Sequence, residues 1–275
     1  MVINMKKILT IQDISCYGQC SITVALPILS SYGIETAILP SAILSTHTCG
    51  FKDFTVLDLT SEMPKIINHW INEGIKFDAI YTGYIGDVRQ FDYVLECKDK
   101  LLVDGGLFIV DPAMADNGKL YPALNNDIVE GMKKICSQAD YIIPNITEAC
   151  LLTDTLYQDK QDKTFINNLL HKLIECGYKN IILTGIISDD KIGAIYYDGT
   201  NETYVLKELQ PTSYHGTGDI FSSVIVANIL NNVDIKTNLD DATDFIVDCI
   251  KNTTNDKDHF YGVKFEEILK KRMNQ

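Results

Sequence analysis

Short apolar runs alternate with stretches of helical spacing along most of the chain. The apolar runs, each followed by polar residues or glycine, are typical of β-strands in a buried sheet. They predict strands at residues 8–11, 36–39, 79–82, 107–110, 141–143 and 180–183. Two further runs, at 192–197 and 203–206, flank a turn that contains Asp198 and Gly199 and predict a β-hairpin.

Between the strands, apolar residues recur at the spacing of an amphipathic helix. Helices are predicted at residues 21–32, 61–73, 88–103, 126–138, 165–176 and 220–230, with others opening at 144–148, 239 and 264. Gly33, Gly74 and Gly177 stand directly after three of these segments, where glycine commonly ends a helix. The alternation predicts an α/β fold with a central, mostly parallel sheet and helices on both faces.

Ligands of such sheets bind beyond the carboxyl ends of the strands. This rule selects the polar residues that come just after predicted strands: Asp13, Tyr84, Asp111, Asn145 and Thr184. We expect them to gather along one edge of the sheet, although they are far apart in the sequence. Polar residues on a solvated rim would occupy the same positions, so the rule narrows the search for a site without proving one.

Composition limits the choice of partners and compartment. The formal net charge of −13 argues against nucleic acid or an anionic membrane surface as partner. No apolar run approaches the roughly 18 residues of a membrane-spanning helix, and the first residues lack a signal peptide's apolar region. The eight cysteines contain no C-x-x-C pair, which favours reduced thiols in a cytoplasmic protein. Because no linker interrupts the pattern, we expect one domain over residues 1–275.

A glycine-rich turn lies directly before the predicted helix at 220–230. It reads His-Gly-Thr-Gly-Asp, and its backbone N–H groups would point outward at the positive end of the helix dipole. Gly216, Thr217 and Gly218 are therefore suited to cradle a phosphate, with Asp219 placed to accept a proton from a hydroxyl. The simpler interpretation is that the glycines end a loop and Asp219 caps a helix.

Asp111 and Glu148 are oxygen donors of the kind that bind Mg²⁺ together with water and phosphate. Each also has a structural interpretation, Asp111 as a turn residue before Pro112 and Glu148 as an acidic residue in the first turn of a helix. Together with the glycine turn they supply metal, anion cradle and proton acceptor, which phosphoryl transfer requires. The chain has no G-x-x-x-x-G-K-[ST] loop, so a kinase of this sequence is not of the Walker type.

These residues carry a resemblance to known kinases. Residues 215–219 resemble the G-T-G-D signature of ribokinase-like kinases, and residues 144–148 resemble their N-x-x-E motif. Within that superfamily the chain most resembles the pyridoxal/pyridoxamine kinases. The segments that carry this closer likeness are 12–18, 45–48, 82–86 and 111–121.

The resemblance implies a ribokinase-like fold and ATP-dependent phosphorylation of the 5′-hydroxymethyl group of a B6 vitamer, usually by a homodimer. It implies that Asp219 is the catalytic base and contacts the substrate. It also implies that the anion hole consists of Gly216, Thr217 and Gly218.

For the ligands, the resemblance implies two sets of residues, one for metal and nucleotide and one for the vitamer. Metal and nucleotide are assigned to Asp111, Asn145, Glu148 and Thr184, with Asp111 and Glu148 as the Mg²⁺ ligands. The vitamer is assigned to Asp13, Thr48, Cys49 and Tyr84. Many members have serine where Asp13 stands and a polar amide where Cys49 stands, which leaves the vitamer preference open. Asp13 could instead cap the following helix.

Three alternatives remain at this point. A hydroxymethylpyrimidine kinase shares the fold and the chemistry. A catalytically inactive nucleotide-binding regulator would keep the fold without turnover. A nicotinamide dehydrogenase is disfavoured because the turn after the first strand contains one glycine and no G-x-G-x-x-G.

Overall fold

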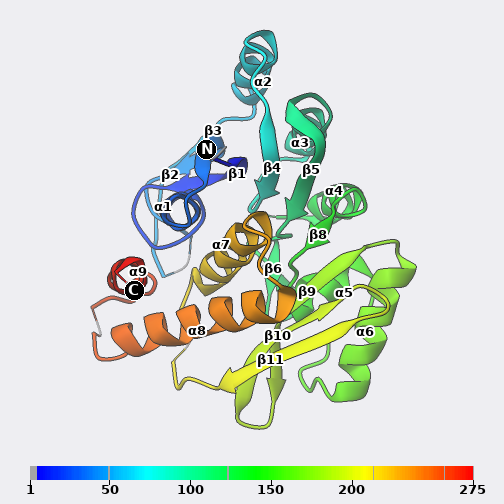
Figure 1. Ribbon diagram of the computed structural model, residues 1–275, viewed down its shortest axis with the longest axis vertical. Coiled ribbons are helices and arrows are strands. Elements are labelled where there is room, and N and C mark those ends of the chain that lie inside the picture. The colour runs from blue at the N-terminus through cyan, green and yellow to red at the C-terminus, as the bar shows by residue number, and fades with distance from the viewer. Residues whose placement is uncertain (1–4, 49, 123, 213, 257, 275) are drawn as a thin grey trace.

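A nine-stranded sheet forms the centre of the protein (Figure 1). The computed structural model describes residues 5–48, 50–122, 124–212, 214–256 and 258–274. The strand order is β11-β10-β9-β8-β5-β4-β1-β2-β3. The strands of the sheet are β1 (Lys7–Ser15), β2 (Glu35–Leu44), β3 (Val56–Asp58), β4 (Phe77–Thr82), β5 (Leu102–Val110), β8 (Tyr141–Ile142), β9 (Asn180–Ser188), β10 (Lys191–Tyr197) and β11 (Glu202–Glu208). A separate small hairpin consists of β6 (Ala115–Asp116) and β7 (Lys119–Leu120).

Parallel pairing dominates the sheet. The neighbours β2, β1, β4, β5, β8 and β9 run parallel to one another. Antiparallel pairs occur at the two edges, where β3 joins β2 and the β10–β11 hairpin joins β9. The predictions of a mostly parallel sheet and of a late hairpin are therefore confirmed.

Helices cover both faces of the sheet (Figure 1). They are α1 (Ile22–Ser31), α2 (Met63–Asn72), α3 (Val88–Leu101), α4 (Asn126–Cys136), α5 (Ile146–Leu152), α6 (Lys163–Glu175), α7 (Thr217–Leu230), α8 (Ile235–Thr253) and α9 (Phe265–Met273). Helices α2 to α6 share one cluster of buried side chains, and α1, α7, α8 and α9 share the other. Side chains alternate between the two faces of a sheet, so adjacent residues of a strand pack into different clusters. In β1, Leu9 packs into the first cluster and Ile8 into the second.

Helix α7 lies in the interior and carries the glycine turn at its start. Its residues from Ile220 to Asn228 are all buried. It packs against α1 and α8 as well as lying against the sheet (Figure 1). A helix that is apolar around its whole circumference belongs in a core. The packing therefore fixes the position of the turn before α7.

Several strands are longer than the apolar pattern predicts, among them β1, β2, β5 and β9. Strand β1 continues to Ser15 and β2 to Leu44, and these extensions pair with each other at Ile14↔Ile43 and Ser15↔Leu44. Strand β3 then pairs with the end of β2. Cross-strand hydrogen bonds keep these less apolar residues in the sheet, which the local pattern could not indicate.

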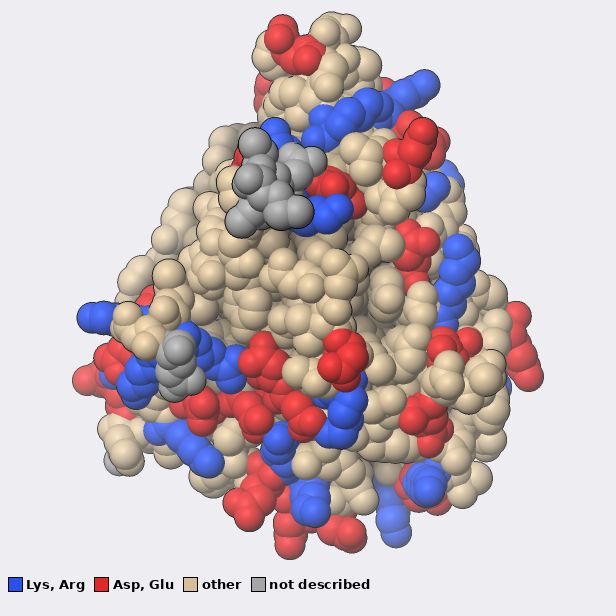
Figure 2. Space-filling view, in the orientation of Figure 1, with Lys and Arg blue, Asp and Glu red and all other residues tan. Residues whose placement is uncertain are grey.

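Charged side chains of both signs are interspersed over the face shown in Figure 2. On α8, Asp240 and Asp244 pair with Lys207 of β11 at 3.2 and 2.9 Å. Within the described ranges, no helix is both long and apolar enough to cross a membrane. The described cysteines are all free thiols: Cys16, Cys20, Cys97, Cys136, Cys150, Cys176 and Cys249.

Candidate active site

The turn before α7 has a backbone conformation that requires glycine. Gly216 is the N-cap of α7 and has a φ of 78°. A Cβ atom at this position would overlap the carbonyl oxygen of Gln19, which crosses directly beside it. The first N–H groups of α7 have no acceptor within the helix and lie at the positive end of its dipole. Such a helix start is a suitable site for an anion.

Asp219 lies in the first turn of α7 and is half-buried. Burial raises the pKa of the Asp111 carboxyl and of the Cys20 thiol, and the nearby charge of Asp219 raises each of them further. Cys20 is also close enough to Asp13 for the charge of that carboxylate to contribute. Asp219 therefore lies near Asp111, and near Cys20, which in turn lies near Asp13.

Asp111 directly follows β5 and is 8 % exposed. Its backbone N–H donates to the Thr82 carbonyl at 3.0 Å, which continues the pairing of β4 and β5 beyond their ends. The Ser222 hydroxyl of α7 donates to Asp111 Oδ2 at 2.5 Å. Burial raises the Asp111 pKa to about 7, although the Ser222 hydrogen bond lowers it. The carboxyl is held between the sheet and α7.

Glu148 and Asn145 form a capping box at the start of α5. Asn145 Oδ1 accepts from the Glu148 N–H at 3.0 Å, and Glu148 Oε2 accepts from the Asn145 N–H at 2.8 Å. Glu148 Oε1 also accepts from the Met114 N–H at 3.1 Å. The structural interpretation of Glu148 as a first-turn residue is confirmed. Because each carboxylate oxygen has two acceptor positions, these bonds leave capacity for a further ligand.

Thr184 lies inside β9 rather than after it, because pairing with β10 extends β9 to Ser188, and it lies beside Asn145. The two residues form an isolated parallel bridge, and the Thr184 N–H donates to the Pro144 carbonyl at 2.9 Å. The residues predicted for the nucleotide thus come together from β9 and the start of α5.

The residues present fit a cation that is shared with a nucleotide. No group of three His, Cys, Asp or Glu side chains in the described part of the chain is arranged to hold a metal. Mg²⁺, however, commonly binds through one or two carboxylates plus water and phosphate oxygens. Burial, and then the charge of Asp111, raises the pKa of Glu148, so the two carboxyls lie close together. A divalent cation would relieve the repulsion between them.

Asp13 lies inside β1 rather than after it, because β1 continues to Ser15. It is 4 % exposed, with Oδ2 accepting from the Ser15 hydroxyl at 2.9 Å and Oδ1 from the Ser21 hydroxyl at 2.5 Å. Burial raises its pKa. Ser21 is the N-cap residue of α1, with a φ of 50°. The alternative in which Asp13 caps the helix is therefore wrong in its details: the carboxylate anchors the N-cap residue and accepts no bond from the helix N–H groups.

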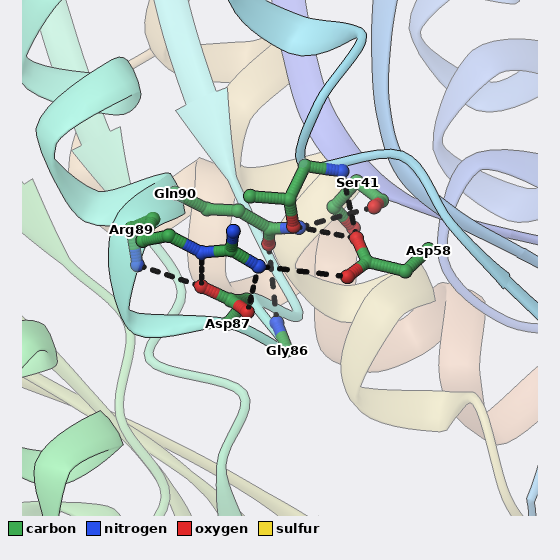
Figure 3. Close-up of polar contacts among 7 residues, drawn as sticks. Ser41, Asp58, Gly86, Asp87, Arg89 and Gln90 are labelled. Carbon is green, nitrogen blue, oxygen red and sulfur yellow. Dashed lines mark hydrogen bonds and ion pairs between the residues drawn. The ribbon is translucent and has the colours of Figure 1, made fainter.

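Tyr84 lies in the turn after β4. Burial, and then the charge of Asp13, raises its pKa, which places its hydroxyl near that carboxylate. The network in Figure 3 holds this turn in place. The Gln90 side-chain amide donates to the Ser41 carbonyl at 3.1 Å and accepts from the Gly86 N–H at 3.3 Å. Ser41 Oγ in turn donates to the Tyr84 carbonyl at 3.3 Å.

The segment after β2 contains the remaining predicted vitamer residues. Thr48 is exposed, and Cys49 lies outside the described residues. His47, the residue before Thr48, is buried. The His47 ring occupies the space into which a Cβ atom at Gly18 would project. His47 Nε2 lies 3.2 Å from the carbonyl oxygen of Tyr261. His47 also lies near Asp13.

Several residues at this site were not indicated by the sequence. Residues 45–48 were singled out only as a motif, which did not distinguish His47. No sequence motif connected the C-terminal segment with the site. In the structure, the Gln19 N–H donates to the carbonyl of Tyr261 in that segment at 3.0 Å. Ser222 carried no sequence signal either, because one serine in an apolar helix is ordinary. Cys20 could have been considered from its closeness in sequence to Asp13.

A family model described as phosphomethylpyrimidine kinase matches residues 8–264 of this chain. The chain belongs to this family. Among the relatives, a pyridoxal kinase of Dictyostelium discoideum is 27 % identical over 98 % of this chain and 93 % of its own length.

Solved structures agree with that membership. A Bacteroides thetaiotaomicron protein with the provisional name phosphomethylpyrimidine kinase, solved with pyridoxal, is 36 % identical with a TM-score of 0.91, covering 99 % of this chain and 96 % of that one. Pyridoxal kinase from Lactobacillus plantarum is 29 % identical with a TM-score of 0.90, covering 98 % of both chains. The ribokinase-like α/β fold predicted from the sequence is thereby confirmed.

Proposed function

We propose that this protein is an ATP-dependent kinase that phosphorylates the 5′-hydroxymethyl group of a B6 vitamer, in the salvage of pyridoxal 5′-phosphate. It would act as one ribokinase-like domain over residues 1–275. The observation that carries the proposal is the position of Asp219 in the first turn of α7, beside the Gly216 turn and near the Asp111 carboxyl. A base, an anion cradle and two opposed binding ends are what phosphoryl transfer to an alcohol requires. The relatives named for pyridoxal kinase support the choice of substrate.

In this mechanism Asp219 accepts the proton of the substrate hydroxyl as the hydroxyl oxygen attacks the γ-phosphorus of ATP. The bond from that phosphorus to the β,γ-bridging oxygen breaks, and ADP leaves. The amides of Gly216, Thr217 and Gly218 receive the negative charge of the transferring phosphoryl group. Because packing holds α7 rigidly, these donors need no rearrangement when that charge develops.

At the nucleotide end, Asn145 and Thr184 would contact ATP, and Asp111 and Glu148 would hold Mg²⁺. The ion, when bound, neutralises charge on the phosphates. Asn145 also orders this end through its side chain, which donates to the Ala115 carbonyl at 2.8 Å.

At the vitamer end, Asp13, Thr48, Cys49 and Tyr84 contact the pyridine ring and its substituents, and Asp219 contacts the hydroxymethyl group. An ionised carboxylate only accepts hydrogen bonds, so Asp13 favours a substrate group that donates. The protonated ring nitrogen and the ammonium of pyridoxamine are such groups.

The second candidate substrate is hydroxymethylpyrimidine, which the name of the matched family favours. Initial rates of ATP consumption and of product formation with pyridoxal, pyridoxamine, pyridoxine and hydroxymethylpyrimidine, measured side by side, separate the two. We expect the vitamers to give the higher kcat/KM. Preference for hydroxymethylpyrimidine would overturn the substrate assignment. No turnover with any of the four, despite nucleotide binding, would identify an inactive regulator.

Replacing Asp13 by serine tests the vitamer end. If the pyridoxamine ammonium is the partner, kcat/KM for pyridoxamine should fall roughly ten- to a hundredfold, and more than for pyridoxal, because a hydrogen bond to a charged group contributes about 1.5–3 kcal/mol. An equal fall for both vitamers would identify the shared ring nitrogen instead. Steady-state kinetics with each vitamer measures this.

Asp13→Asn is the matched control, because it keeps the size of the side chain and an acceptor for Ser21 but removes the charge. It should reproduce the kinetic loss with a smaller change in melting temperature. If neither variant alters kcat/KM while the serine variant melts earlier, Asp13 only anchors Ser21 and does not belong to the site.

We further propose a cytoplasmic homodimer. Strand β3 ends the sheet and exposes Val56 and Leu57, at 56 % and 59 %, along its edge. Apolar edge strands left open invite pairing with another chain. Sedimentation equilibrium reads the oligomeric state directly.

A further inference from the structure

Ser222 lies at the junction between the base-carrying helix and the metal end of the site. It is 2 % exposed and lies three residues after Asp219, so both side chains project from neighbouring positions on α7. Its hydroxyl donates to Asp111 Oδ2 at 2.5 Å. The bond joins residues that are 111 positions apart in the sequence.

This hydrogen bond has a specific consequence for Asp111. The Ser222 hydroxyl ties the Asp111 carboxylate to α7. The bond restricts the rotation of the carboxylate about its bond to Cβ and uses one of the two acceptor positions of Oδ2. The residue is still 8 % exposed, so the group keeps access to the site. Outer partners of this kind commonly set the orientation of metal-ligating side chains.

The neighbouring serine has a different task. Ser223 is completely buried, and its hydroxyl donates to the Asp219 carbonyl oxygen at 2.6 Å, one turn back in the same helix. Such a bond holds the hydroxyl within the helix, and the Ser223 side chain also lies beside the buried Tyr81 of β4. Two adjacent buried serines thus differ in whether they contact the Asp111 carboxylate.

We propose that Ser222 is a positioning residue that orients Asp111 for the cation shared with the nucleotide. The proposal rests on the proposed function, since it takes Asp111 as the carboxylate that meets that cation. It also means that one helix, α7, carries the base Asp219 and, through Ser222, orients the carboxylate of Asp111 at the metal end of the site.

The test compares Ser222→Ala with Ser223→Ala. Binding of ATP is measured at equilibrium by calorimetry across a Mg²⁺ titration, which needs no turnover, and melting temperatures report folding. We expect S222A to raise the Mg²⁺ concentration at half-saturation roughly tenfold, as loss of an outer partner of a metal ligand does. The KM for ATP should rise with it, whereas the KM for the vitamer should not. S223A should leave the Mg²⁺ dependence unchanged.

Equal Mg²⁺ dependence in S222A, S223A and wild type would overturn the proposal and leave Ser222 with a packing role. If S222A does not fold, Ser222→Cys carries the same comparison, because it keeps the volume but donates weakly. It should then shift the Mg²⁺ dependence in the same direction, and an unshifted titration would again overturn the proposal. If the wild-type protein binds ATP with Mg²⁺ but phosphorylates no substrate, the kinase assignment is wrong, while the proposed role of Ser222 in Mg²⁺-dependent ATP binding is still tested by the titration.

Discussion

Asp219→Asn is expected to lower kcat by at least ~100-fold, the loss typical of removing a general base. Asparagine keeps the size of the side chain and its place in the first turn of α7, but it cannot accept the hydroxyl proton. Since the base acts only in the transition state, kcat should fall while the KM for ATP stays close to wild type. Initial rates at saturating ATP and vitamer measure this effect.

Equilibrium binding of ATP with Mg²⁺ is the control for this variant, and it should be retained because the amides of the turn are unchanged. Near-normal turnover by Asp219→Asn would remove Asp219 from the catalytic role. A loss of nucleotide binding equal to the loss of kcat would instead show that the substitution disturbs the whole start of α7.

Gly216→Ala is expected to lower kcat/KM by roughly 100- to 1,000-fold, the range for losing a main-chain donor that stabilises transition-state charge. The added Cβ would overlap the Gln19 carbonyl oxygen, and alanine at a φ of 78° is strained by about 1–3 kcal/mol. Both effects move the turn away from the position that the phosphoryl group needs. The melting temperature should fall as well, and kinetics and thermal unfolding together check the prediction.

Gly218→Ala is the matched control two residues further along. A Cβ atom at Gly218 would meet no atom within 4 Å, and this glycine does not need a positive φ. The melting temperature of Gly218→Ala should stay near wild type. If Gly216→Ala retains activity and stability to the same degree, the close approach to Gln19 does not shape the anion hole.

The sequence was informative wherever one segment decides its own structure. Alternating apolar runs and helical spacing predicted the mostly parallel sheet, because each strand between two helical layers is apolar on both faces. The apolar stretch after Asp219 likewise predicted a helix, which α7 is, and the structure shows that this helix is buried. The structure is less predictable at the ends of β1 and β2, where hydrogen bonds to a neighbouring strand extend the sheet beyond the apolar residues.

At the site, the sequence determined which residue types are present and in what order, and the carboxyl-edge rule placed most of them. Thr184 and Asn145 do meet, and Asp111 does lie next to Glu148. The spacing of residues within one segment could not predict contacts between distant segments, because these contacts depend on how the helices pack on the sheet. The capping box of Glu148 is the opposite case, since both of its partners lie within four residues.

By itself, the sequence determined the α/β architecture, the glycine turn and the identity of the candidate base, since propensity and periodicity act over short stretches. Only the tertiary structure decided that Gln19 passes against Gly216 and that Ser222 reaches Asp111. It also decided that Asp13 holds the start of α1. Each of these contacts joins separate elements, and the packing of the core against the sheet sets the distance between them.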